Sequence, residues 1–126
     1  MNSKKIGNKI EVKLRKTLSY WGFFAHLLVD NKNGQPFDII AIKNGKIFAI
    51  DSKASISNRF NRSRIEDNQY SSLAKIAKEG AYTGFAIYYK NEFYFLEFKN
   101  INTGVKSYEI TKLPKLEEYL RECLLH

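Results

Sequence analysis

Two aspartates and a lysine fall where a short hairpin would bring their side chains together. The stretch FDIIAIKNGKIFAIDSK predicts strands at Phe37–Ile42 and Lys46–Lys53, because the Asn-Gly pair between them supplies the positive φ angles of a type I′ turn. Counting outward from that turn places Asp38 opposite Asp51, with Lys53 on the same face of the sheet. The sequence therefore predicts two carboxylates and an ammonium group at one end of an otherwise apolar hairpin.

This arrangement favours metal-assisted phosphodiester chemistry. Directly opposed residues have Cβ atoms roughly 4.5–5.5 Å apart, and two carboxylates at that distance repel each other. A divalent cation removes the conflict, since Mg²⁺ binds one or two carboxylates together with waters and substrate phosphate. We expect Mg²⁺ at Asp38 and Asp51, with Mn²⁺ as a substitute. The alternative is a solvated strand end with a structural Asp–Lys pair, and the hairpin pattern alone leaves it open.

Length and composition indicate one domain spanning residues 1–126. The 126 residues are 44% hydrophobic, which is enough for a single core. With Cys123 as the one cysteine and with two histidines, the sequence excludes an intramolecular disulfide and a Cys/His zinc site. This usage favours a cytoplasmic setting, or a host cytoplasm if the chain is phage-encoded. We expect no membrane span, no targeting segment and no small-molecule cofactor, since the corresponding motifs are absent from the sequence.

The positive charge is concentrated in the first half of the chain. The formal net charge is +8, but residues 1–64 carry +9 and residues 65–126 carry −1. Such asymmetry favours a polyanionic partner, and nucleic acid is the commonest one for a basic domain. The lysines and arginines that we expect to contact DNA phosphates are Lys4, Lys5, Lys9, Lys13, Lys16, Arg59, Arg62 and Arg64. The last three lie in a segment that reads as a mobile loop between residues 54 and 64.

Helical periodicity predicts a first helix at residues 6–21 with one buried stripe. Glu11 lies beside that stripe, close enough to the buried edge to point over the sheet. Its other interpretation is an ordinary i,i+4 partner of Arg15. Gly22 ends this helix, and the apolar run Phe23–Val29 predicts a strand buried on both faces.

A second long helix is expected at Arg64–Glu79. Ser63 followed by Glu66 has the spacing of a capping box, and Gly80 suits a helix C-terminus. Gln69 falls on the buried stripe of this helix. A polar amide there is either satisfied within the core or lines a site.

The last third of the chain predicts a hairpin and a closing helix. Strands Gly84–Tyr89 and Glu92–Phe98 flank a Lys-Asn turn, and Pro114 is placed in the first turn of an amphipathic helix. Residues 99–112 are ambiguous and read as a loop with a short edge strand. The closing helix either covers the sheet or pairs with another subunit.

This order of elements, with Asp on one strand and Asp-x-Lys on the next, resembles the PD-(D/E)xK nuclease superfamily. The matching stretches are Pro36-Phe37-Asp38 and Asp51-Ser52-Lys53, with Glu11 where the family has a glutamate on its first helix. Within the superfamily, GNKIEVKL, FDIIAIKNGKIFAIDSK and DNQYSSLAKIAKEGAYTGFAIYY look most like Holliday-junction resolvases of the RecU and Hjc types. The chain departs from the pattern by an Asp at position 51 in place of the commoner Glu, and by the Phe before Asp38.

The resemblance implies an α/β fold with a restriction-endonuclease-like core. This core is a central mixed β-sheet of about five strands flanked by helices, in the order αβββαββα. It also implies a Mg²⁺-dependent endodeoxyribonuclease that cuts four-way junctions and leaves 5′-phosphate and 3′-hydroxyl ends. The expected catalytic residues are Glu11, Asp38, Asp51, Lys53 and Gln69. The expected metal ligands are Asp38, Asp51, the Ser52 backbone carbonyl and Glu11, the last directly or through water.

Two other functions remain open at the level of sequence. The same fold could serve a restriction-like, transposon-associated or repair nuclease that acts on duplex or branched DNA. It could also serve a non-catalytic DNA-binding module. A junction resolvase must make two matched cuts, so we expect a two-fold homodimer on branched DNA.

Overall fold

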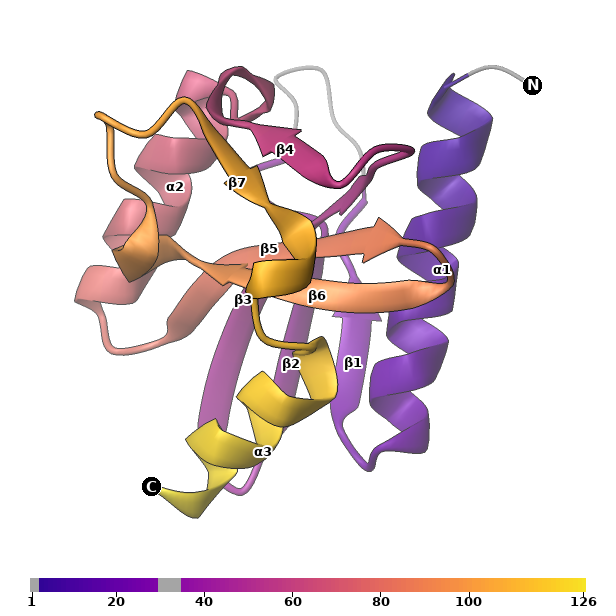
Figure 1. The fold of residues 1–126 in the computed structure, drawn as a ribbon. Helices are drawn as coiled ribbons and strands as arrows, with labels where there is room; N and C mark the ends of the chain where they lie inside the picture. The colour runs from indigo at the N-terminus through magenta and orange to yellow at the C-terminus, as the bar shows by residue number, and fades with distance from the viewer. Residues whose placement is uncertain (1–2, 30–34) are drawn as a thin grey trace.

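The computed structural model describes residues 3–29 and 35–126, with side chains described from residue 9 onward (Figure 1). In these ranges the α-helices are α1 (Ser3–Tyr20), α2 (Asp67–Lys78) and α3 (Leu116–Leu125). The strands are β1 (Phe24–Leu27), β2 (Ile39–Lys43), β3 (Lys46–Ala54), β4 (Arg59–Asn61), β5 (Tyr82–Tyr89), β6 (Glu92–Glu97) and β7 (Ser107–Glu109).

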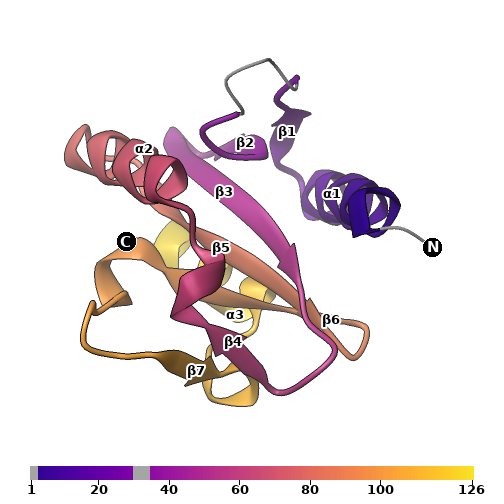
Figure 2. The same ribbon diagram turned by 90° about the horizontal axis from the view of Figure 1, so that it is seen from above.

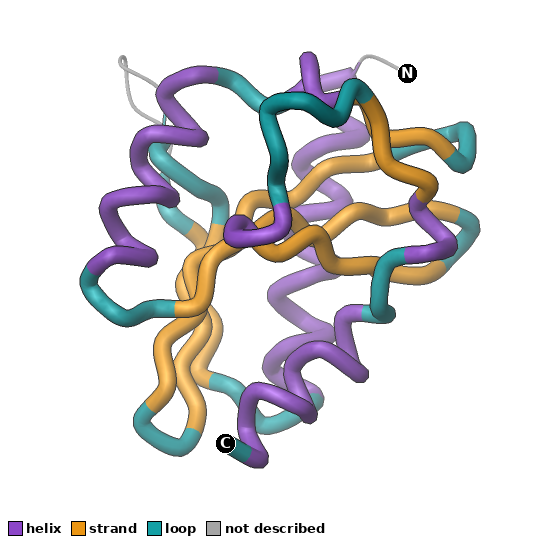
Figure 3. Tube along the Cα trace, turned by 60° about the vertical axis from the view of Figure 1, so that its left-hand side comes forward, coloured by secondary structure: helices purple, strands orange, loops and turns teal. Residues whose placement is uncertain are grey.

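Strands β1, β2, β3, β5 and β6 form a mixed sheet in that order. Strands β3 and β5 are parallel, and the other neighbours are antiparallel. The short strands β4 and β7 form a separate antiparallel pair. Figure 3 shows the strands running through the middle of the molecule with helices around them. The predicted α/β class, the five-stranded mixed sheet and the order of its elements are confirmed.

The turn between β2 and β3 has the predicted geometry. Asn44 and Gly45 have φ angles of 52° and 75°, as a type I′ turn requires. The recorded pairs run from Lys43–Lys46 to Ile39–Ile50, in the counted register. The β5–β6 turn is built in the same way, with positive φ at Lys90 and Asn91.

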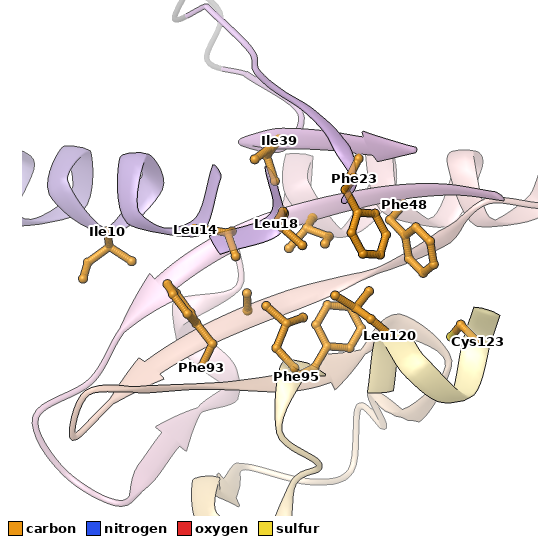
Figure 4. Close-up of a cluster of buried hydrophobic side chains, with 14 residues drawn as sticks. Ile10, Leu14, Leu18, Phe23, Ile39, Phe48, Phe93, Phe95, Leu120 and Cys123 are labelled. Carbon is orange, nitrogen blue, oxygen red and sulfur yellow. The ribbon is translucent and has the colours of Figure 1, made fainter. Parts of the chain in front are cut away.

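The two faces of the sheet bury different hydrophobic clusters. Residues Phe48 and Ile50 of β3 pack in a cluster with Leu14 and Leu18 of α1 and with Leu120 of α3 (Figure 4). The alternating position, Ala49, packs in a second cluster with Leu73 of α2 and Phe60 of β4. Figure 2 shows α1 and α2 on opposite sides of β3. Because side chains alternate along a strand, Asp51 and Lys53 share the α2 face with Ala49.

The first strand differs from its prediction. We expected Phe23–Val29 to be buried on both faces, but β1 covers only Phe24–Leu27 and lies at the edge of the sheet. Phe24 is 62% exposed and Val29 is 83% exposed. An apolar run therefore does not by itself identify a central strand, because β1 has a neighbouring strand on one edge only in the described sheet.

The segment after β3 is also more ordered than expected. In place of a mobile loop, residues 59–61 form β4, which pairs with β7, and Arg62–Arg64 form a 3₁₀ turn. Strand β7 therefore pairs with β4 and does not extend the edge of the main sheet. The aromatic ring of Phe60 explains this order, since it is fully buried in the second cluster.

Two helix starts lie later than predicted. Helix α2 begins at Asp67 with Glu66 as its N-cap, because Ile65 is extended and buried in the second cluster. Helix α3 begins at Leu116, so Pro114 precedes the helix and is not in its first turn. The Pro114 carbonyl instead accepts a hydrogen bond from the Phe95 amide at 2.9 Å, which ties this segment to β6.

Gly84→Ala should lower the free energy of unfolding by about 3 kcal/mol, because buried cores tolerate overpacking poorly. A Cβ at Gly84 would lie 2.4 Å from the Leu96 carbonyl oxygen and 2.6 Å from the Phe95 ring. Chemical denaturation measures the effect. Gly104→Ala is the matched control, since its Cβ would meet Asn102 at an ordinary 3.4 Å. Equal stability of the two variants would contradict the close packing of β5 against β6.

Candidate active site

Asp38 lies immediately before β2, where the regular strand pairing ends. The last recorded pair is Ile39–Ile50, and the Asp38 amide donates to the Ile50 carbonyl at 3.1 Å. The counted register predicted that Asp38 pairs with Asp51 in the ladder. This prediction is wrong, because the ladder ends one residue earlier. The two carboxyl groups are neighbours nonetheless, since Asp38 lies close enough to raise the pKa of Asp51.

Both oxygens of the Asp38 carboxylate are held by hydrogen bonds. The Ser52 amide donates to Asp38 Oδ2 at 2.7 Å, and the Ser52 hydroxyl donates to the same oxygen at 2.9 Å. The Gln35 side-chain amide donates to Asp38 Oδ1. Asp38 itself is only 7% exposed. These contacts fix the carboxylate where the hairpin meets the segment that precedes it.

Asp51 is the more deeply buried carboxyl group, with 1% of its surface exposed. Its Oδ2 lies 3.3 Å from the Lys53 ammonium group and accepts a hydrogen bond from Gln69 Nε2 at 3.2 Å. The pKa of Asp51 is raised to about 8, chiefly by burial and also by the neighbouring Asp38, while Lys53 opposes the shift. A pKa this high means that the surroundings of Asp51 stabilise its ionised form poorly.

Gln69 connects the hairpin to the start of α2. Its Oε1 accepts hydrogen bonds from Lys53 Nζ at 3.2 Å and from the Glu66 amide at 3.3 Å. Gln69 is thus the N3 residue of a capping box whose N-cap is Glu66, whereas the sequence predicted Ser63 as the N-cap. The same half-buried side chain therefore bonds both to the N-terminus of α2 and to the Asp51–Lys53 pair.

Glu11 belongs to α1, which packs on the other face of the sheet. Helix α1 packs in the first cluster, whereas Asp51 and Lys53 share the face that α2 covers. Within the described part of the chain, no three Asp, Glu, His or Cys side chains are close enough to hold a metal ion together. The structure therefore brings together Asp38, Asp51, Lys53 and Gln69, and does not group Glu11 with them.

The predicted phosphate contacts fall on two surfaces. Lys9, Lys13 and Lys16 are exposed on α1 and line a depression of about 660 Å³ that also includes Tyr20 and Tyr88. Lys4 and Lys5 belong to α1, but their side chains lie outside the described residues.

The arginines are held by contacts of their own. Arg59 donates to the Ser107 hydroxyl at 2.6 Å and Arg64 to the Ala54 carbonyl at 2.7 Å, while Arg62 stacks over the Tyr70 ring at 5.0 Å. These side chains stabilise the β4–β7 region in addition to any contact with a ligand. A segment rich in arginine is therefore not in itself evidence of a mobile loop.

Two residues of this network were not predicted from sequence. Gln35 and the Ser52 side chain both contact Asp38, although only the Ser52 carbonyl was expected at the site. Gln35 lies outside any helix or strand pattern, three residues before Asp38, so no periodicity marks it. Its position next to Pro36 was the available signal, since Pro36 restricts Gln35 to extended geometry.

Comparison with known proteins identifies the family. The model of the family described as archaeal Holliday junction resolvase (Hjc) matches residues 2–123. The chain belongs to this family. The sequence matches none of the curated proteins.

One solved structure shows the same fold. The structure of Archaeoglobus fulgidus Hjc, a Holliday junction resolvase from an archaeal hyperthermophile, is 19% identical with a TM-score of 0.72. That similarity covers 90% of this chain and 93% of the other. The structure of SSO0001 is 18% identical with a TM-score of 0.48, over 76% of this chain and 52% of the other.

Family membership establishes the class of activity. The chain is a junction-resolving endonuclease, and its family consists of metal-dependent nucleases that act on branched DNA. None of the described helices has the length and apolar character needed to cross a membrane. Membership of the resolvase family excludes the non-catalytic DNA-binding module that the sequence left open.

The residues present fit a divalent cation. Asp38 and Asp51 supply hard carboxylate oxygens, which Mg²⁺ prefers. Burial and the neighbouring Asp38 raise the pKa of Asp51 even with Lys53 at 3.3 Å, so further positive charge would stabilise the ionised pair. A doubly charged ion would supply what one ammonium group does not.

Without metal, the free energy of unfolding should fall as pH rises from about 5 to about 8. The pKa of Asp51 is raised from 3.8 to about 8 in the folded state, so over this range folded Asp51 keeps a proton that the unfolded chain has already released. The loss is on the order of 3–4 kcal/mol, at 1.36 kcal/mol per pKa unit.

Denaturation in a chelating buffer at both pH values measures this dependence. Asp51→Asn should flatten it, whereas the exposed Asp67→Asn should not. The same slope in wild type and Asp51→Asn would show that Asp51 is ionised in the folded protein.

Proposed function

We propose that this chain cleaves four-way DNA junctions at a Mg²⁺ site formed by Asp38 and Asp51. The observation that carries the proposal is the buried pair of carboxyl groups, with Lys53 Nζ 3.3 Å from Asp51 Oδ2. Buried charges of one sign persist where a ligand of the opposite sign completes the site. The position of the pair in a resolvase of the Hjc family supports a catalytic role for it.

Three groups would hold the cation: the Asp38 and Asp51 carboxylates and the Ser52 backbone carbonyl. Ser52 has a second task, since its amide and hydroxyl hold Asp38 Oδ2 at 2.7 and 2.9 Å. When bound, Mg²⁺ polarises the scissile phosphate and lowers the pKa of a coordinated water. Mn²⁺ should substitute, because it also accepts carboxylate and water ligands.

Lys53 is the residue that we assign to the attacking water. Its Nζ donates to Gln69 Oε1 and pairs with Asp51, so the ammonium group is fixed at the edge of the carboxylate pair. As an ammonium group it orients the water and offsets the negative charge that develops on the phosphate, and as a neutral amine it would take the proton of the water. Attack that expels the 3′-oxygen leaves 5′-phosphate and 3′-hydroxyl ends.

Gln69 and Glu11 are assigned supporting roles. Gln69 positions both Lys53 and Asp51, since it accepts from one and donates to the other at 3.2 Å. Glu11 would act through a bridging water, because α1 covers the face of the sheet opposite Asp51. This role of Glu11 requires a solvent path around the end of the sheet.

The DNA would lie across the basic surfaces of α1 and β4. Exposed lysines and arginines attract phosphates without reading sequence, which suits an enzyme that recognises the shape of a junction. Two symmetric cuts require two active sites, so we propose a two-fold homodimer. We propose that the reaction occurs in the cytoplasm, or in a host's cytoplasm for a phage-encoded chain.

Asp51→Asn should lower the rate of junction cleavage in Mg²⁺ by about 10³-fold or more, since metal stabilisation of the transition state is worth several kcal/mol. Junction binding should be retained. The assay compares cleavage of a labelled four-way junction and of a linear duplex of the same sequence, with binding measured separately in Ca²⁺. Asp67→Asn serves as the control. Wild-type cleavage by Asp51→Asn would remove this site from the mechanism.

Replacing Lys9, Lys13 and Lys16 together by alanine should weaken junction binding and flatten its salt dependence. Each lost phosphate contact reduces the slope of log K against log salt by about 0.9, so three contacts predict a change of about 2–3. Fluorescence anisotropy over a salt series gives the slope. Lys75→Ala with Lys78→Ala is the control, because these lysines lie at the end of α2 away from Gln69. An unchanged slope in the α1 variant would place the DNA elsewhere.

A further inference from the structure

Gln35 presents a buried oxygen without a partner beside the carboxylate pair. Its Nε2 donates to Asp38 Oδ1, while its Oε1 is buried and accepts no hydrogen bond from the described part of the chain. The residue lies just before Pro36, at the entrance to the hairpin. The contact with Asp38 therefore accounts for the Gln35 nitrogen, but no described contact accounts for its oxygen.

The orientation of the Gln35 amide is fixed by chemistry. A carboxylate only accepts hydrogen bonds, so the nitrogen of the amide must face Asp38 Oδ1. The reversed orientation would place two acceptor oxygens against each other. Oε1 must consequently point away from Oδ1 while staying within the same buried region.

A buried acceptor without a donor is unfavourable, because it loses the hydrogen bonds that it would make to water. The donor that reaches it must come from outside the described chain. Asp38 cannot supply one, and Ser52 directs both its amide and its hydroxyl to Asp38 Oδ2. A water molecule is the simplest donor of suitable size.

The proposed cation would bring such water to this place. Mg²⁺ keeps several of its waters when proteins bind it through one or two carboxylates, and those waters need acceptors. In the described structure no third carboxylate joins Asp38 and Asp51. A neutral amide oxygen next to Asp38 can fill that role without adding repulsion to the pair.

We propose that Gln35 Oε1 accepts a hydrogen bond from a water bound to the divalent cation, while Nε2 holds Asp38. Gln35 is then a positioning residue for the metal site. The inference rests on the proposed function, since it requires a cation at Asp38 and Asp51. Outer-shell partners of this kind contribute about 10–100-fold to metal affinity.

Mn²⁺ binding without DNA tests the inference independently of cleavage. Titrations followed by the electron paramagnetic resonance signal of free Mn²⁺ would compare wild type with Asp51→Asn, Gln35→Leu and Gln35→Glu. Gln35→Leu removes the donor and the acceptor and should bind Mn²⁺ about 10-fold more weakly. Gln35→Glu loses the donation to Asp38 but keeps an oxygen for the water and adds a negative charge that attracts the cation, so its affinity should fall less than that of Gln35→Leu. Thermal unfolding without metal identifies any variant that fails to fold.

The outcomes separate the two proposals. Equal losses in Gln35→Leu and Gln35→Glu would show that only the donation to Asp38 matters and would overturn the role of Oε1. Wild-type affinity in Gln35→Leu, with loss in Asp51→Asn, would overturn the inference and leave the proposed function standing. If wild type binds no Mn²⁺ through Asp51, both proposals fail.

Asn58→Ala provides the matched control. The Asn58 amide donates to the Thr111 hydroxyl and accepts from the Thr111 amide, both at 2.9 Å, so its two ends are satisfied within the β4–β7 region. Its removal should change stability without changing Mn²⁺ affinity. A loss of affinity equal to that of Gln35→Leu would mean that the effect is general and not local to the site.

Discussion

The burial of the Asp51 carboxyl group next to Asp38 is the constraint that organises this structure. Strand β3 lies between β2 and β5, which leaves Asp51 almost no contact with water. Lys53 compensates in part, and Gln69 binds both side chains from the start of α2. Burial still raises the pKa of Asp51 to about 8, so the compensation is incomplete. A bound cation would complete this compensation and stabilise the ionised pair.

The local backbone explains how the pair is brought together. The β2–β3 ladder is regular up to Ile39–Ile50, after which the Asp38 amide bonds to Ile50 and the Asp38 carboxylate turns to Ser52. This departure from the ladder lets Asp38 accept bonds on both oxygens while it stays beside Asp51. The hydrophobic clusters on the two faces hold the hairpin rigidly, so the site gains its precision from strands and not from a loop.

The sequence predicts the hairpin well because its signals are local. Asn44-Gly45 specifies the turn, and alternation then places Lys53 on the same face as Asp51. The edge position of β1 could not be predicted, since an apolar run does not say whether a neighbouring strand exists. The choice between Ser63 and Glu66 as the cap of α2 depended on the burial of Ile65, a long-range contact. Gln35 was missed for the same reason, because its partner depends on how the chain enters the hairpin.

The most direct measurement of the central claim is anomalous diffraction from crystals of the protein grown with Mn²⁺ and a non-cleavable junction. The account predicts an Mn²⁺ peak within coordination distance of carboxylate oxygens of both Asp38 and Asp51, about 2.0–2.3 Å for an ion that prefers oxygen ligands. Soaking in Mg²⁺ should displace it. An Mn²⁺ ion bound elsewhere, with Asp38 and Asp51 in contact only with Lys53, Gln69 and Ser52, would contradict the account.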